Sequence, residues 1–121
     1  MAKFNPSVMI KNIENEIVDK QKDYADKILK KIIDTSPVKS GHYKLNNKVS
    51  IDTRDYSEVP GVDPGGSSAL QRGRAKIDQV KKLGHEIIIQ NNVEYADSIE
   101  FGHSDQAPAG VYRVALLGVA R

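Results

Sequence analysis

Three consecutive residues near the C-terminus, His103, Ser104 and Asp105, have the side-chain types of a hydrolase triad. A triad needs a nucleophile, a base and an orienting acid that converge from separate elements, and sequence neighbours do not take that geometry. The other two histidines, His42 and His85, stand alone, and no two histidines have the spacing of metal ligands. The sequence therefore predicts no catalytic residue and no metal site.

A glycine-rich segment at residues 61–66 reads Gly-Val-Asp-Pro-Gly-Gly and invites comparison with a phosphate-binding loop. Such a loop needs a lysine at a fixed position after its glycines, and this segment has none. The sequence also contains no nucleophile elbow and no dinucleotide fingerprint. We therefore expect no enzyme, no cofactor and no small-molecule substrate.

The chain has 121 residues, and we expect one domain that spans residues 1–121. It contains no cysteine, which excludes disulfides and is typical of a reducing compartment. No apolar run approaches the roughly 20 residues that span a bilayer, and the N-terminus lacks the apolar core of a signal peptide. These features predict synthesis and use in a cytosol, without a membrane partner.

The net charge of +2 is too small to predict nucleic-acid binding, but the charges are segregated along the chain. Residues 72–82 are mainly basic, whereas residues 94–105 contain acidic side chains and no lysine or arginine. Opposed patches on one small domain favour self-association, although ordinary solvated faces give the same pattern. Tyr95 and Phe101 either anchor a neighbouring molecule or fill the core of the monomer. The candidate contact residues are Arg72, Arg74, Lys76, Glu94, Tyr95, Asp97, Glu100, Phe101 and Asp105.

Apolar residues recur at spacings of three, four and seven over residues 7–34, which predicts one long amphipathic helix. Pro37 limits this helix, because the residue before a proline avoids the helical region. A helix of about 26 residues would span roughly 39 Å, which is long for so small a domain. We expect part of it to pack on something beyond the chain's own sheet; the alternative is a helix lying across one sheet face. The apolar stripe consists of Ile10, Ile13, Ile17, Tyr24, Ile28 and Ile32.

A second, shorter helix is predicted from Ser67 or Ser68, either of which can cap it, to Leu83, with Gly84 as its stop. Gly73 inside this helix indicates a close backbone approach. Residues 54–68 have no periodicity and contain prolines and glycines, which predicts a mobile loop that orders only on assembly.

Strands are expected at residues 48–53, which alternate, at 85–90, whose apolar centre suggests burial on both faces, and at 111–117. The predicted fold class is α+β, with the long N-terminal helix and the second helix packed on a small, mainly antiparallel sheet.

A specific pattern follows Asn92: Tyr95-Ala96, then Ile99-Glu100-Phe101-Gly102, then Ser104, then Gln106-Ala107-Pro108-Ala109-Gly110. It resembles the tail-completion or head–tail joining proteins of long-tailed phages, often described as minor tail protein Z-like. Asp105 stands where that family usually has lysine. Further similar segments are Pro37-Val38-Lys39-Ser40-Gly41, Arg72-Gly73-Arg74 and Leu83-Gly84.

The resemblance implies a structural virion protein with no catalytic residues. It implies a ring, usually six-fold, at the head–tail junction or neck, with a channel through which phage DNA passes without sequence-specific binding. The implied partners are other copies of the chain and the neck, connector, and tail-tube or tail-terminator proteins. The implied location is the virion, after assembly in the host bacterial cytoplasm. Two alternatives remain open: a tail terminator or head-side connector subunit, and a small DNA-associated protein that uses the basic second helix.

Overall fold

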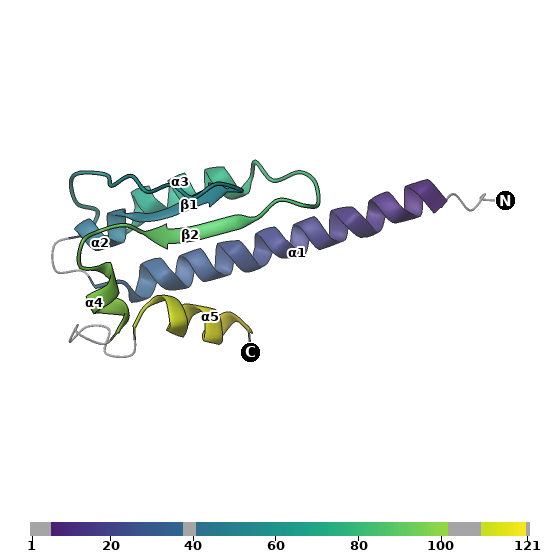
Figure 1. The fold of residues 1–121 in the computed structure, drawn as a ribbon. Helices are drawn as coiled ribbons and strands as arrows, with labels where there is room; N and C mark the ends of the chain where they lie inside the picture. The colour runs from purple at the N-terminus through teal and green to yellow at the C-terminus, as the bar shows by residue number, and fades with distance from the viewer. Residues whose placement is uncertain (1–5, 38–40, 102–109, 121) are drawn as a thin grey trace.

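The computed structural model describes residues 6–37, 41–101 and 110–120. It has the predicted α+β fold, with a long N-terminal helix, shorter helices and a two-stranded antiparallel sheet (Figure 1). None of the helices in these residues is long and apolar enough to cross a membrane. The elements in chain order are α1 (Pro6–Thr35), α2 (His42–Leu45), β1 (Asn47–Ile51), α3 (Ser67–Ile77), β2 (Ile87–Asn91), α4 (Ala96–Glu100) and α5 (Tyr112–Ala120).

The predicted long helix is confirmed, and the other elements pack against it. The sheet and α3 lie on one side of its C-terminal half, α5 lies on another, and its N-terminal end projects beyond the body (Figure 1). Two apolar clusters hold the layers together. One joins α1 to β1 and α3 through Leu29, Val49 and Ala69, and the other joins α1 to α4 and α5 through Ile32, Ile99 and Ala115.

The strands pair in antiparallel fashion, with Val49 opposite Ile89 and Ile51 opposite Ile87. The positions of both strands agree with the sequence prediction to within about two residues. The predicted burial of the second strand on both faces is wrong, because the sheet in the described part of the chain has two strands and every residue of β2 is half-buried. The face with Val49, Ile87 and Ile89 packs towards the helices.

The predicted third strand at residues 111–117 is wrong, because this segment forms helix α5. Val111 and Ala115 are both fully buried, and their spacing of four places them on one helical face against α1. The Glu100 carboxylate accepts hydrogen bonds from the main-chain N–H groups of Val111 and Tyr112, which are otherwise unsatisfied at a helix start. A residue from α4 therefore favours a helix where the apolar run alone suggests a strand.

Helix α3 ends at Ile77 rather than at Leu83, since tight turns follow in which Gln79 N–H and Val80 N–H bond to carbonyls three residues back. Neither Ser67 nor Ser68 caps it with its side chain; instead the Asp63 carboxylate accepts the N–H of Ala69. The close approach predicted at Gly73 is confirmed. A Cβ there would lie 2.4 Å from Leu29 Cδ2 and 3.0 Å from Val49 Cγ2, so only glycine lets α3 pack this tightly on α1 and β1.

Candidate assembly surface

The residues with catalytic side-chain types do not form a site in the part of the chain that is described. His103, Ser104 and Asp105 lie outside the described residues. His42 Nδ1 lies 2.8 Å from the Gly61 carbonyl oxygen, and His85 Nδ1 lies 2.7 Å from Asp52 Oδ2, so both histidines tie neighbouring loops together. No group of three or more His, Asp or Glu residues among the described positions could hold a metal ion.

The acidic segment at residues 94–101, which includes α4, has two exposed aromatic side chains. Phe101 is 68% exposed, with the Arg113 guanidinium 5.9 Å from its ring centre, so it does not fill the core. Tyr95 is 40% exposed, and its ring centre lies 6.4 Å from that of Tyr43. Glu94 is exposed. The side chain of Asp97 and the whole of Asp105 lie outside the described structure.

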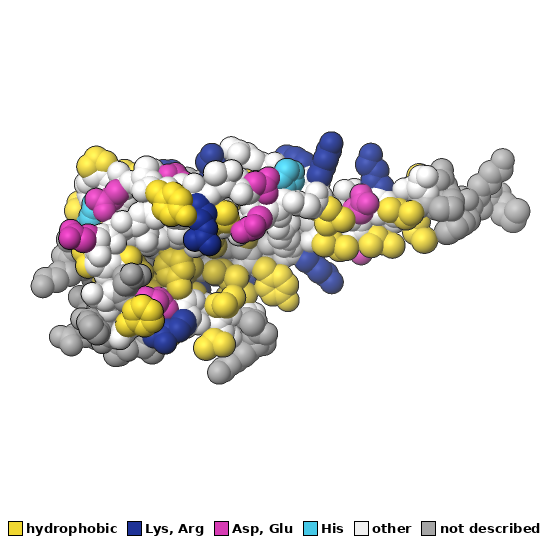
Figure 2. All heavy atoms as spheres, viewed as in Figure 1, with side chains coloured by type: hydrophobic (Ala, Val, Ile, Leu, Met, Phe, Trp, Pro, Cys, Tyr) yellow, Lys and Arg dark blue, Asp and Glu magenta, His cyan; other side chains and the backbone are white. Residues whose placement is uncertain are grey.

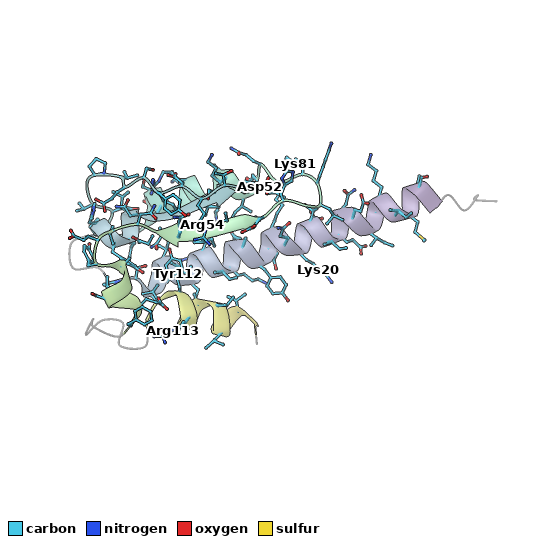
Figure 3. The ribbon with its side chains drawn as sticks, viewed as in Figure 1. Lys20, Asp52, Arg54, Lys81, Tyr112 and Arg113 are labelled. Atoms are coloured by element: carbon cyan, nitrogen blue, oxygen red, sulfur yellow. The ribbon has the colours of Figure 1, made fainter. Side chains whose placement is uncertain are left out.

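Glu100 is bound within its own chain. Its Oε1 accepts the main-chain N–H groups of Val111 at 3.0 Å and Tyr112 at 2.8 Å, and its Oε2 accepts the N–H of Arg113 at 3.0 Å. Figure 3 places Tyr112 and Arg113 at the start of α5, beside α4. Partial burial opposes ionisation, but these bonds and the Arg113 side chain outweigh it and hold the pKa of Glu100 below its usual value. Glu100 of α4 therefore caps helix α5 of the same chain, and this arrangement disfavours the predicted pairing of Glu100 with a neighbouring subunit.

Replacement of Glu100 by glutamine should lower the free energy of unfolding by about 2 kcal/mol at pH 7, because charged acceptors make the stronger hydrogen bonds. The folded-state pKa of Glu100 is depressed, so its contribution is present above the unfolded pKa of about 4.3 and is lost as the pH falls through the folded pKa. Urea unfolding at pH 7 and at pH 3 would measure this. The difference between wild type and Glu100→Gln should shrink at pH 3; an equal difference at both values would show that the charge of Glu100 does not act in this way.

The basic side chains of α3 are also partly used within the chain. Arg74 Nε lies 2.6 Å from Asp26 Oδ1 in an ion pair between α3 and α1, and Arg72 Nη2 donates to the Leu45 carbonyl oxygen. Lys76 is exposed. The structure thus places two of the three predicted basic contact residues in bonds that position α3, which the local sequence could not reveal because the partners are 27 and 48 residues away.

The segment that follows β1, predicted to be mobile, is held by side-chain amides. Asn46 Oδ1 accepts the N–H of Val59 at 2.6 Å, while Asn46 Nδ2 donates to the Val59 carbonyl oxygen at 2.9 Å. Asn92 Nδ2 donates to the carbonyl oxygens of Asp55 and Ser57. Ordering on assembly stays a prediction, but these bonds favour a defined loop in the single chain.

In the described residues, the N-terminal part of the predicted stripe of α1 is uncovered. From here on, the apolar stripe means the four residues of this part: Ile10, Ile13, Ile17 and Tyr24. Each of these side chains is about half exposed, at 48–54%. The same helical face continues into the core, where Ile28 is partly buried and Ile32 is 1% exposed. Figure 2 shows hydrophobic side chains in a row along the projecting part of α1. Further exposed apolar residues that the sequence reasoning did not single out are Met9 beside the stripe, Val8 on the opposite face of α1, and Leu116 and Leu117 on α5.

No family model matches the chain, and none of the curated proteins or solved structures compared with it does.

Proposed function

We propose that the chain is a structural virion protein of a tailed phage, a subunit of a ring at the head–tail junction that helps to join the tail to the head. The observation that carries the proposal is the apolar stripe, which one chain leaves uncovered along the projecting part of α1. Contiguous exposed apolar surface of this kind marks an interaction site. The resemblance of residues 92–110 to tail-completion proteins supports the assignment of that interaction to the phage neck.

The size of the stripe suits a contact with another copy. The four stripe residues, each near half exposure, present with the flanking Met9 on the order of 500 Å² of surface, a large part of the about 800 Å² that each partner buries in a standard interface. Burial of apolar side chains stabilises association by roughly 25 cal/mol for each Å² removed from water. The stripe alone therefore supplies a substantial contact.

The polar face of the same helix favours a protein partner over a membrane surface. Helices that lie on membranes have a polar face rich in lysine and arginine. Here Glu14, Glu16 and Asp19 accompany Lys11 and Lys20 on the exposed side of α1. Mixed charges beside an apolar stripe are typical of helices that pair with other helices.

Fewer features of the chain support the two alternative functions. A tail terminator or a head-side connector subunit would use the same stripe, so these differ from the proposal only in position along the neck. A DNA-associated protein would need a free basic face on α3. The ion pair with Asp26 offsets the charge of Arg74, and the bond to the Leu45 carbonyl oxygen occupies one donor group of Arg72, so both side chains are less available to phosphates.

A stop codon at Gln21 in the phage genome tests the proposed function. Cells infected under non-suppressing conditions should accumulate filled heads and separate tails, and a plasmid copy of the wild-type gene should restore joined particles. Electron microscopy of the lysate would count the two kinds of particle. Joined, infectious particles made at the normal yield without the protein would contradict the proposal.

A further inference from the structure

The two-stranded sheet has an open edge on the side of β2 that faces away from β1. Asp52 N–H donates to the Glu86 carbonyl oxygen, so these two opposite residues are a hydrogen-bonded pair. Hydrogen-bonded pairs recur at every second residue of an antiparallel ladder, and the next ones are therefore Ser50 with Ile88 and Lys48 with Gln90. The N–H and C=O groups of Ile87 and Ile89 therefore point away from β1. Within the described residues, these outward groups have no hydrogen-bond partner.

This open edge borders a groove of about 660 Å³ between β2 and α1. Ile87 and Ile89 form one wall, and Tyr24, Ala25 and Ile28 of α1 form the apolar part of the other. Gln21 lies at the end of the groove nearer the N-terminus of α1. Free main-chain groups beside an apolar groove are the features that bind an extended peptide as an added strand.

The chain also has a segment without regular secondary structure, residues 55–59, whose main-chain groups are bound at every second residue. The main-chain groups of Asp55, Ser57 and Val59 are bound, mostly by the side-chain amides of Gln90, Asn92 and Asn46, as a neighbouring strand would bind them. The residues between them, Tyr56 and Glu58, have main-chain N–H and C=O groups without a partner in the described structure. In an extended chain these alternate groups point to the opposite side.

The two free edges match. Ile87 and Ile89 offer outward groups two residues apart, and so do Tyr56 and Glu58. The Tyr56 side chain is 73% exposed, and it has the apolar body and polar tip that suit a groove lined by Ile28, Ile87 and Gln21.

We infer that residues 55–59 of one copy add as a third strand to β2 of the next copy, with the Tyr56 ring in the groove between β2 and α1. The inference rests on the proposed function, since it adds a second contact between ring subunits to the contact made by the apolar stripe. The donor segment and the acceptor groove are different surfaces of the chain, so the contact is head-to-tail. Contacts of this type close into rings when the rotation between copies allows it.

Cross-linking between single-cysteine variants tests whether residues 55–59 lie in the groove. The natural chain has no cysteine, so each variant carries one thiol. Tyr56→Cys in one protein and Gln21→Cys in a second, differently tagged protein should form a disulfide-linked heterodimer when the two are mixed with a mild oxidant at concentrations that permit assembly. Asn15→Cys, on the exposed face of α1 away from the groove, replaces Gln21→Cys as the matched control and should give at least about ten-fold less heterodimer. Equal yields for the two pairs would overturn the assignment of residues 55–59.

Amide exchange of the unmodified protein, followed by NMR in dilute and assembled samples, tests the edge itself. In dilute solution, the Ile88 and Gln90 amides should exchange slowly and the Ile87 and Ile89 amides quickly. Assembly should slow exchange at Ile87, Ile89, Tyr56 and Glu58 by about ten-fold or more.

Assembly with fast exchange at Ile87 and Ile89 would overturn the inference while leaving the proposed function standing. Slow exchange there without the Tyr56–Gln21 cross-link would show that another strand occupies the edge, which also overturns it. Failure to assemble, together with joined particles made without the protein, would instead remove the proposed function.

Discussion

Replacing Asn47 by alanine should lower the free energy of unfolding by about 3–5 kcal/mol, because it leaves several buried polar groups unpaired. Asn47 is 1% exposed. Its Nδ2 donates to Ser36 Oγ at 3.0 Å, and its Oδ1 accepts from Asn91 Nδ2 at 3.1 Å and from the Tyr112 hydroxyl at 2.9 Å. One side chain thereby connects the end of α1, both strands and α5.

Urea unfolding at pH 7 would measure this effect, with Asn15→Ala as the matched control because Asn15 is an exposed asparagine on α1. The control should change stability by no more than about 0.5 kcal/mol. Tyr112→Phe removes one bond of the same network and should cost about 1–2 kcal/mol. The double variant should lose less unfolding free energy than the sum of the losses of the two single variants, since both substitutions remove the same hydrogen bond. A loss below about 1 kcal/mol for Asn47→Ala would contradict this role of the network.

Replacing Ile13 and Ile17 together by serine should weaken self-association by about 100-fold or more, since each buried isoleucine contributes roughly 1.5–3 kcal/mol to a contact. Both side chains are about half exposed in the single chain, so the free energy of unfolding should change little. Sedimentation velocity over a series of concentrations would measure the association, and thermal unfolding of dilute samples would measure stability.

Asn12→Ser with Asn15→Ser is the matched control, because these exposed residues lie on the same length of α1 but off the apolar stripe. The control should associate like the wild type. Association of Ile13→Ser/Ile17→Ser at wild-type strength would mean that the stripe is not the contact surface. A large fall in its thermal stability would mean that the stripe belongs to the fold of the single chain.

The sequence predicted those parts of the fold that depend on local pattern. The long helix follows from its apolar periodicity, and the close approach at Gly73 follows from a glycine in a helix. The C-terminal helix could not be predicted in this way. Its run of apolar residues fits a strand as well as a helix, and the Glu100 carboxylate that caps it belongs to another element.

The candidate site was predicted in part for the same reason. Charge segregation identified Glu100 and Arg74 as candidate contacts, but each binds a partner in its own chain that lies far away in sequence. The apolar periodicity predicted the correct face of α1, but it did not show at which residue the sheet and α5 stop covering that face. That limit depends on the length of the sheet and of α5 relative to α1, which places Ile32 in the core and leaves Ile13 exposed.

An image of the particle neck by electron cryo-microscopy, at a resolution that separates side chains, would show directly whether this chain forms the neck ring. We expect a ring of copies of this chain at the head–tail junction, in which Ile13 and Ile17 of each copy are buried against a neighbouring copy. A neck without this chain, or a ring in which the apolar stripe faces solvent, would contradict it.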